Sequence, residues 1–335
     1  MDFADIFAFL KARLAQGQPC VLVTVCAVEG SSMRNPGTLM GVARDGAFTG
    51  SLSGGCIENA VVAEALDALD HGAARIVRFG AGSPYLDIKL PCGGGLDVHF
   101  QPLHAGTPDA ETPDADTPDA DTLCTDTGVV DAALASIARR APFALAHDGT
   151  QLRHVDDWRP SSPLAQGGRW SFGYWPAPRL QIVGHGAGVE ALARLALETG
   201  CAVSVLTPDA ALLADLEARA IPAQRLARID QTQLLSSDAW TATIFLFHDH
   251  DWEIALMARA LDMPHFYLGA MGGRRAHAFR SEALLARGVS APAIAAIHAP
   301  IGLFHSSRDP HTLALSTLAE VIKAYQHTDF EAALG

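Results

Sequence analysis

Apolar positions in the first hundred residues alternate between helical and strand-like spacing. They recur every three or four positions over residues 3–16, which predicts an amphipathic helix. The β-branched run over 20–28 predicts a buried strand. Further strands are expected at 38–43, 47–50, 75–79 and 96–101, with a long helix from Ile57 to about Leu69. These elements predict an α/β domain over residues 1–104.

Residues 105–127 lack this patterning. They repeat Thr-Pro-Asp-Ala and carry additional acidic residues. With low hydrophobicity, like charges and regularly placed prolines, this segment cannot bury enough apolar surface to offset the conformational entropy lost on ordering. We therefore expect a solvated linker. Residues 128–177 hold a predicted helix at 129–139 and short strands, and we expect them to form a connecting segment.

From residue 178 to 335, short apolar runs alternate regularly with amphipathic stretches. Strands are expected at 180–183, 202–206, 242–247 and near 265–268, with helices between them and a final helix from about Thr312 to Tyr325. Glycine-rich turns follow several of these strands. Such a series predicts a Rossmann-like, doubly wound parallel sheet, so the fold class is α/β in both domains.

Composition and charge restrict the class of partner. The chain has 335 residues, of which 49% are hydrophobic, and its formal net charge is −13. An acidic surface argues against nucleic acid as the main partner, because phosphate binding needs clustered Lys and Arg. No apolar run approaches the roughly 20 residues that a membrane span requires, and acidic residues stand where a signal peptide carries basic ones. We therefore expect a cytoplasmic protein with no membrane segment.

Two of the six cysteines stand beside paired glycines in the N-terminal domain. In Gly54-Gly55-Cys56-Ile57-Glu58 the cysteine precedes a helix, where backbone amides and the helix dipole favour the thiolate. In Cys92-Gly93-Gly94 the bare amides can close around an anion. A thiolate suits a soft metal or sulfur exchange, so Cys56 and Cys92 are candidate metal ligands. The alternative is that both are small buried thiols packed near tight turns.

The turn Gly184-His185-Gly186-Ala187-Gly188 follows a predicted strand and precedes a helix, as a dinucleotide-binding fingerprint requires. Gly184 would make the tight turn and Gly186 would let the backbone approach a phosphate. Val189 replaces the third small residue of that fingerprint. Thr207 stands where a ribose-binding acid is usual. These departures weaken the case for NAD(P) binding.

Two further groups of polar residues follow predicted strands of the C-terminal domain. His248 and His250 stand where open α/β sheets bind ligands, and on an extended segment they point the same way. They are candidates for a metal or an anion, or else incidental neighbours of an aspartate that caps a helix. Arg274 follows a glycine pair and offers a guanidinium group to a phosphate, or is an ordinary solvated charge.

In their order and spacing, these motifs resemble the XdhC/CoxI family of molybdenum-hydroxylase maturation proteins. The N-terminal resemblance covers about 10–103, through residues 24–34, 50–58 and 91–100. The C-terminal resemblance covers about 179–325, through residues 184–188, 248–251, 269–275 and 300–303.

The resemblance implies a molybdenum cofactor (molybdopterin) chaperone that does not itself catalyse metabolic turnover. Such a protein supports sulfuration of the cofactor by a cysteine desulfurase and its insertion into xanthine dehydrogenase, and is expected to be a homodimer. Carried over, Cys56 and Cys92 are the leading cofactor-binding candidates, and Gly184, Gly186 and Gly188 lie in the family's Rossmann turn. Ala187 departs from the family's usual histidine, and Thr207 from its usual acid.

Two other functions remain open at the level of sequence. One is an NAD(P)-dependent oxidoreductase that uses the C-terminal domain. The other is a scaffold that holds desulfurase and dehydrogenase together without retaining cofactor.

Overall fold

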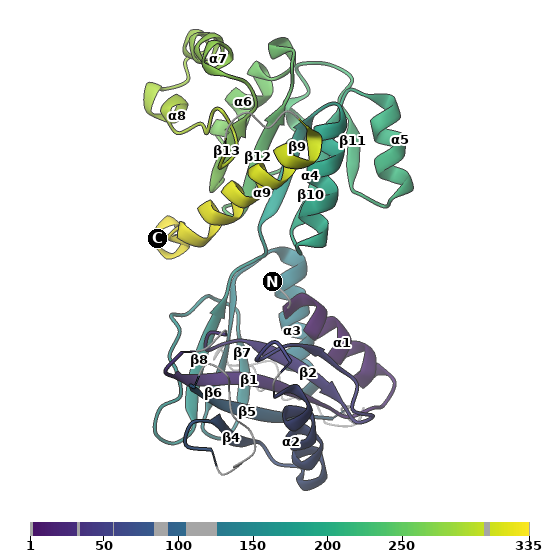
Figure 1. The fold of residues 1–335 in the computed structure, drawn as a ribbon, viewed down its shortest axis with the longest axis vertical. Helices are drawn as coiled ribbons and strands as arrows, with labels where there is room; N and C mark the ends of the chain where they lie inside the picture. Colours follow the sequence, from purple (N-terminus) through teal and green to yellow (C-terminus); the bar gives the residue numbers. More distant parts are fainter. Residues whose placement is uncertain are drawn as a thin grey trace, which may run out of the picture. The chain divides into compact units, whose positions relative to one another are not determined.

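The computed structural model describes residues 3–31, 34–55, 57–83, 93–104, 126–304 and 309–334. The chain divides into two units, residues 1–176 and 177–335, which are coloured purple to teal and teal to yellow in Figure 1. Most of the expected linker, residues 105–125, lies outside the described residues. Each unit is described below by itself.

An antiparallel sheet forms the centre of unit 1, with strand order β3-β2-β1-β5-β4. Its strands are β1 (Cys20–Glu29), β2 (Leu39–Ala43), β3 (Phe48–Gly50), β4 (Arg75–Gly80) and β5 (Gly95–Leu103). Alternate residues of β1 point into two different cores. Val21, Val23 and Val25 pack with helix α2 (Glu58–His71). Cys20, Leu22 and Cys26 pack with helix α1 (Phe3–Ala15) on the other face. Because β1 is covered on both faces, its sequence is continuously apolar.

Residues 126–174 form a second layer of unit 1, and not the connecting segment that we expected. Helix α3 (Asp126–Arg139) precedes strands β6 (Phe143–Asp148), β7 (Leu152–Val155) and β8 (Arg169–Tyr174), which pair in the order β7-β6-β8. Their apolar side chains share a core with α1 and β1, where the Phe7 and Phe143 rings lie 6.2 Å apart between centroids. These residues therefore complete the N-terminal fold.

Unit 2 is the predicted Rossmann-like domain. Its five strands are parallel and ordered β11-β10-β9-β12-β13. Helices pack on both faces of this sheet, and each face has its own hydrophobic core. The strands are β9 (Arg179–Gly184), β10 (Ala202–Thr207), β11 (Ala223–Arg225), β12 (Thr241–Leu246) and β13 (Tyr267–Ala270). The α-helices are α4 (Ala187–Glu198), α5 (Ala210–Ala218), α6 (Ile254–Leu261), α7 (Arg274–Ala286), α8 (Ala291–Ala295), α9 (Pro310–His327) and α10 (Phe330–Leu334), and short 3-10 turns cover Thr232–Leu234 (η1) and His250–Trp252 (η2).

The strand order reverses between β9 and β12, which lie side by side although helices and two strands separate them in sequence. In open α/β sheets this reversal creates a crevice at the carboxyl ends of the strands. Among the helices that the structure describes, none combines the length and apolarity needed to cross a membrane.

Candidate cofactor-binding site

The registers of the antiparallel sheet bring the N-terminal motifs to one end of unit 1. Glu29, the last residue of β1, pairs with Gly95, the first residue of β5. On the other side of the sheet, Gly50 ends β3 opposite Met40 near the start of β2, which runs antiparallel to β1. The connections 30–38, 51–57 and 81–94 therefore leave the sheet at the same end. Cys56 and Cys92 belong to the last two of these connections and themselves lie outside the described residues.

Glu58 holds the connection that carries Cys56. Its carboxylate accepts hydrogen bonds from both serine hydroxyls of the loop, Ser51 at 2.8 Å and Ser53 at 2.7 Å. The backbone N–H groups of residues 52, 53 and 57 also donate to it. Burial alone would raise the pKa of Glu58, but these hydrogen bonds outweigh it and lower the pKa from 4.5 to about 2. The described contacts of Glu58 therefore shape the loop.

The predicted glycines serve two different purposes. Gly54, Gly55 and Gly93 have φ values of 79°, 114° and 71°, a backbone conformation that favours glycine. Among the described residues, none has an atom within 4 Å of a Cβ added at Gly55 or Gly93, so no described side chain crowds either backbone. Gly94 is different, because its Cβ would lie 2.3 Å from the carbonyl oxygen of Ser31. Gly94 thus lets the Cys92 loop pass against the turn that follows β1.

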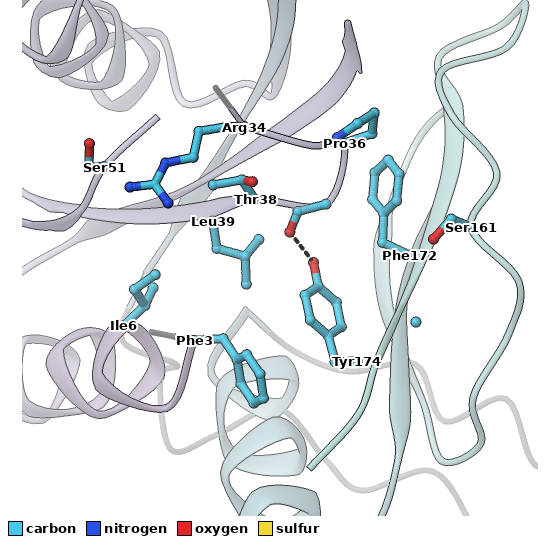
Figure 2. Close-up of a pocket in the computed structure, with 12 residues that line it drawn as sticks. Phe3, Ile6, Arg34, Pro36, Thr38, Leu39, Ser51, Ser161, Phe172 and Tyr174 are labelled. Carbon is cyan, nitrogen blue, oxygen red and sulfur yellow. Dashed lines mark hydrogen bonds between the residues drawn. The ribbon is translucent and has the colours of Figure 1, made fainter. Parts of the chain in front are cut away.

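A cavity of about 290 Å³ opens beside the first residue of the Cys56 loop. Figure 2 shows Arg34 reaching along it towards Ser51, and Thr38 also lines the cavity. Phe172 and Tyr174 form the opposite wall, and the Tyr174 hydroxyl donates to the Gly37 carbonyl oxygen at 2.9 Å. The cavity therefore combines a cation, hydroxyl groups and aromatic rings.

The cysteines that the structure describes are not candidates for thiolate chemistry. Cys20, Cys26 and Cys201 are free and buried. Burial raises the pKa of Cys20 to about 11 and that of Cys26 to about 12, and it also raises the pKa of Cys201. At neutral pH these thiols stay protonated, because desolvation penalises the thiolate.

In unit 2 the Gly184 turn has the geometry of a phosphate-binding turn. Gly184 pairs with Leu246 of β12, and its Cβ would lie 2.5 Å from the Leu246 carbonyl oxygen. Gly186 precedes α4 with φ 86°, and a Cβ there would meet no atom of the described part of the chain within 4 Å. Gly188 faces Leu313 of α9, so its small size serves helix packing. The turn can admit an anion at the start of α4.

The ribose-binding position of a dinucleotide site is not supplied by the residues at the end of β10. Thr207 is buried, and its hydroxyl accepts a hydrogen bond from the Asp209 N–H. Asp209 in turn caps α5, accepting from the N–H groups of Ala211 at 2.9 Å and Leu212 at 3.2 Å. The Oδ1 atom of Asp209 therefore caps the helix and is not directed at a ribose.

The other C-terminal candidates line the carboxyl edge of the sheet. His248 is exposed, and its ring lies 5.9 Å from that of His185 between centroids. His250 begins the 3-10 turn after β12, but its side chain lies outside the described residues. Arg274 is exposed at the first position of α7, after the neighbouring strand β13. Within the described part of the chain, no three His, Cys, Asp or Glu side chains group so that they could hold a metal ion.

Several residues that position these sites were missed as candidates from sequence. Arg34 lies in a motif that we used only for the resemblance, and His185 lines a second cavity of about 270 Å³ with Asp249 and Trp252. Glu320 accepts hydrogen bonds from the Tyr267 hydroxyl at 2.8 Å and the Gly302 N–H at 2.6 Å. Arg34 follows a small-residue turn and His185 stands within the glycine turn, but no local pattern identifies Glu320, because its partners Tyr267 and Gly302 are distant in sequence.

Comparison with known proteins agrees with the geometry. A model of the XdhC Rossmann domain matches residues 180–321, and a model of the XdhC and CoxI family matches residues 13–80. The molybdenum cofactor insertion chaperone PaoD of Escherichia coli (strain K12) is 32% identical over 338 residues, covering 99% of this chain and 92% of that protein.

A crystal structure from Bacillus halodurans, described as a xanthine dehydrogenase, has a TM-score of 0.72 at 18% identity and covers 96% of each chain. That likeness shows the fold. The two family matches and the full-length relative confirm the resemblance found in the sequence, and the chain belongs to the XdhC and CoxI family.

Proposed function

We propose that this protein is a molybdenum cofactor chaperone. It binds the cofactor as cargo, supports its sulfuration by a cysteine desulfurase, and promotes its insertion into a molybdenum hydroxylase of the xanthine dehydrogenase type. The observation that carries the proposal is the similarity, over 99% of the chain, to a molybdenum cofactor insertion chaperone. We further propose that it acts in the cytoplasm as a homodimer.

The cargo has three chemical parts, and the groups at the loop end of unit 1 suit two of them, the phosphate and the metal. A molybdopterin carries a phosphate, a dithiolene that holds the metal, and a pterin ring. The open backbones at Gly55 and Gly93 can approach an anion closely. We propose Cys56 and Cys92 as the soft ligands or sulfur-handling groups, since their loops leave the same end of one sheet. The role that we propose for Glu58 is to position the Cys56 loop.

The test is retention of cofactor by the purified protein. Anaerobic mixing with molybdenum cofactor, followed by desalting, should leave near-stoichiometric molybdenum and pterin in the protein fraction. We expect Cys56→Ser and Cys92→Ser to lower retention at least about tenfold, because a hydroxyl is a poor ligand for a soft metal. Cys124→Ser, outside both Cys–Gly motifs, is the matched control. Full retention in the Cys56/Cys92 double variant would refute the assignment of the cysteines.

Unit 2 offers some support for an oxidoreductase that uses NAD(P). Its strand order and the open Gly186 turn fit a dinucleotide, whereas the buried Thr207 and the capping role of Asp209 do not. Saturable binding of NAD(P)H, followed by its fluorescence and lost in Gly186→Val, would favour this function. A scaffold without cofactor would instead bind both partner enzymes and retain no molybdenum.

A further inference from the structure

We propose that Arg78 positions the Cys92 loop and neutralises the carboxylates at its base, so that an anionic cargo can approach Cys92. This inference rests on the proposed function and deepens it, because it gives a part in cargo binding to a side chain outside the two Cys–Gly motifs. Arg78 belongs to β4 and pairs with Asp97 of β5. The connection 81–94, which carries Cys92, begins directly after β4.

All three nitrogen atoms of the Arg78 guanidinium group have partners at the base of this loop. Nε donates to the carbonyl oxygen of Ala81, the first residue of the connection, at 2.8 Å. Nη1 donates to the Asp97 carboxylate at 2.9 Å, and Nη2 pairs with the Glu29 carboxylate. The planar guanidinium group therefore joins the start of the loop to strands β1 and β5 in a fixed geometry.

The same guanidinium group borders the other end of the loop. A Cβ added at Gly95, the first residue of β5, would lie 2.6 Å from the Nη2 atom of Arg78. The Gly94 carbonyl oxygen accepts a hydrogen bond from the Ala81 N–H at 3.0 Å, which closes the base of the loop. A Cβ at Gly94 would also lie 2.7 Å from the carbonyl oxygen of Glu29. Both ends of the loop and the end of β1 thus meet at one arginine.

Solvent exposure separates this role from a general contribution to stability. The Glu29 side chain is 73% exposed and that of Arg78 is 25% exposed, so solvent screens the pair and it contributes little to stability. Arg75, on the same strand, also pairs with two carboxylates, those of Glu64 at 2.6 Å and Asp67. Its partners belong to α2 and not to the base of a loop, which makes Arg75 a matched comparison.

Arg78 also determines the charge at the base of the loop. Its single positive charge faces the carboxylates of Glu29 and Asp97, and without it both carboxylates would be uncompensated. Cys92 is three residues before Gly95, and three residues of chain span at most about 11 Å. This reach is close to the Debye length of about 10 Å at 0.1 M salt. Loss of Arg78 would therefore repel an anion that approaches Cys92.

The experiment compares alkylation of Cys92 by neutral iodoacetamide and by anionic iodoacetate in the full-length, cofactor-free protein, with mass spectrometry of the Cys92 peptide. Both reagents attack the same thiolate, so the ratio of their rates cancels thiolate fraction and loop accessibility and reports local charge. In Arg78→Gln the iodoacetate rate relative to iodoacetamide should fall about twofold at low ionic strength, and this difference should vanish in 1 M salt. Arg78→Lys should keep the wild-type ratio, and Arg75→Gln should change it clearly less than Arg78→Gln does.

An unchanged ratio in Arg78→Gln, or an equal fall in Arg75→Gln, would overturn the proposal. Circular dichroism checks folding, and if Arg78→Gln does not fold, Asp97→Asn gives the same test with the opposite sign, because removal of a carboxylate should raise the ratio.

The cofactor-retention assay separates this proposal from the proposed function. We expect Arg78→Gln to retain at least about threefold less molybdenum than the wild type, and Arg78→Lys to lie between them, since it keeps the charge but not the planar group. Equal retention by wild type and Arg78→Gln refutes only the role of Arg78. A wild type that retains no cofactor refutes the chaperone, and the ratio of alkylation rates then decides the role of Arg78.

Discussion

Glu58 illustrates how a single carboxylate can shape a loop beside a candidate ligand. Its folded-state pKa of about 2 lies below the ordinary value of 4.5, so its contribution to stability is complete above pH 4.5 and is lost as the pH falls towards 2. Glu58→Gln removes the charge and leaves loop N–H groups without acceptors. We expect a loss of about 2 kcal/mol in the free energy of unfolding at pH 7, measured by urea denaturation. An unchanged midpoint would contradict this role.

His99 predicts a second pH dependence. The side chain is only 1% exposed, and its ring lies 4.4 Å from that of His147 between centroids. Burial, and then the neighbouring His147, lower the pKa of His99 from 6.5 to about 3. Its contribution to stability is therefore complete above pH 6.5 and falls as the pH drops towards 3.

At pH 5 this loss should reach about 2 kcal/mol, since one proton changes stability by about 1.4 kcal/mol per pH unit. His99→Phe should flatten the curve of unfolding free energy between pH 7 and pH 5, and the same substitution at the exposed His71 should not. A wild-type slope that persists in His99→Phe would show that other groups cause it.

Thiol reactivity can be predicted for the described cysteines. Cys20, Cys26 and Cys201 are buried with raised pKa values, so iodoacetamide at pH 8 should leave them unmodified in the native protein and modify them in urea. Mass spectrometry of peptides after timed labelling gives the result. Rapid native labelling of Cys26 would mean that the second layer of unit 1 does not cover it.

At the scale of elements, a buried ion pair joins α6 and α7 to the turn after β13. Arg280 and Glu253 are both fully buried with 2.9 Å between the Arg280 Nη2 and Glu253 Oε1 atoms, and Arg280 also donates to the Met271 carbonyl oxygen. Arg280→Met removes the cation that neutralises the buried Glu253 carboxylate. The substitution should lower the free energy of unfolding by about 3–5 kcal/mol.

The double variant Arg280→Met/Glu253→Leu should recover much of that loss, because no buried charge is left behind. Arg228→Met provides the comparison, since Arg228 pairs with Asp230 at 2.9 Å on the surface, where solvent screens the pair, and the free energy of unfolding should stay close to that of the wild type. Additive losses in the buried double variant would contradict the coupling.

Elements were more predictable from sequence than the site. The expected strand at 20–28 is observed as Cys20–Glu29, and the expected helix from Ile57 is observed as Glu58–His71, because local apolar spacing determines both. The cavity was not foreseen. Its wall depends on the hydrogen bond between Tyr174 and Gly37, which are 137 positions apart, and local patterns carry no information about such a contact.

At the scale of the whole molecule, the two units have different folds and different candidate sites. Unit 1 gathers the Cys–Gly loops and the Arg34 cavity at one end of an antiparallel sheet, and unit 2 keeps a Rossmann crevice with an open glycine turn. The alternating pattern after residue 178 was sufficient to predict unit 2. The place of residues 126–174 was not predictable, because their strands have no helix between them and pack against β1, more than a hundred positions earlier.

Delivery of the cargo tests the central claim most directly. Protein loaded with sulfurated cofactor would be mixed anaerobically with a cofactor-free molybdenum hydroxylase of the xanthine dehydrogenase type, and the hydroxylase activity would be followed over time. We predict activation that is several-fold faster than with the same amount of free cofactor, and slower activation when Cys56→Ser or Cys92→Ser protein is used. Equal activation by free cofactor and by loaded protein would contradict the chaperone account.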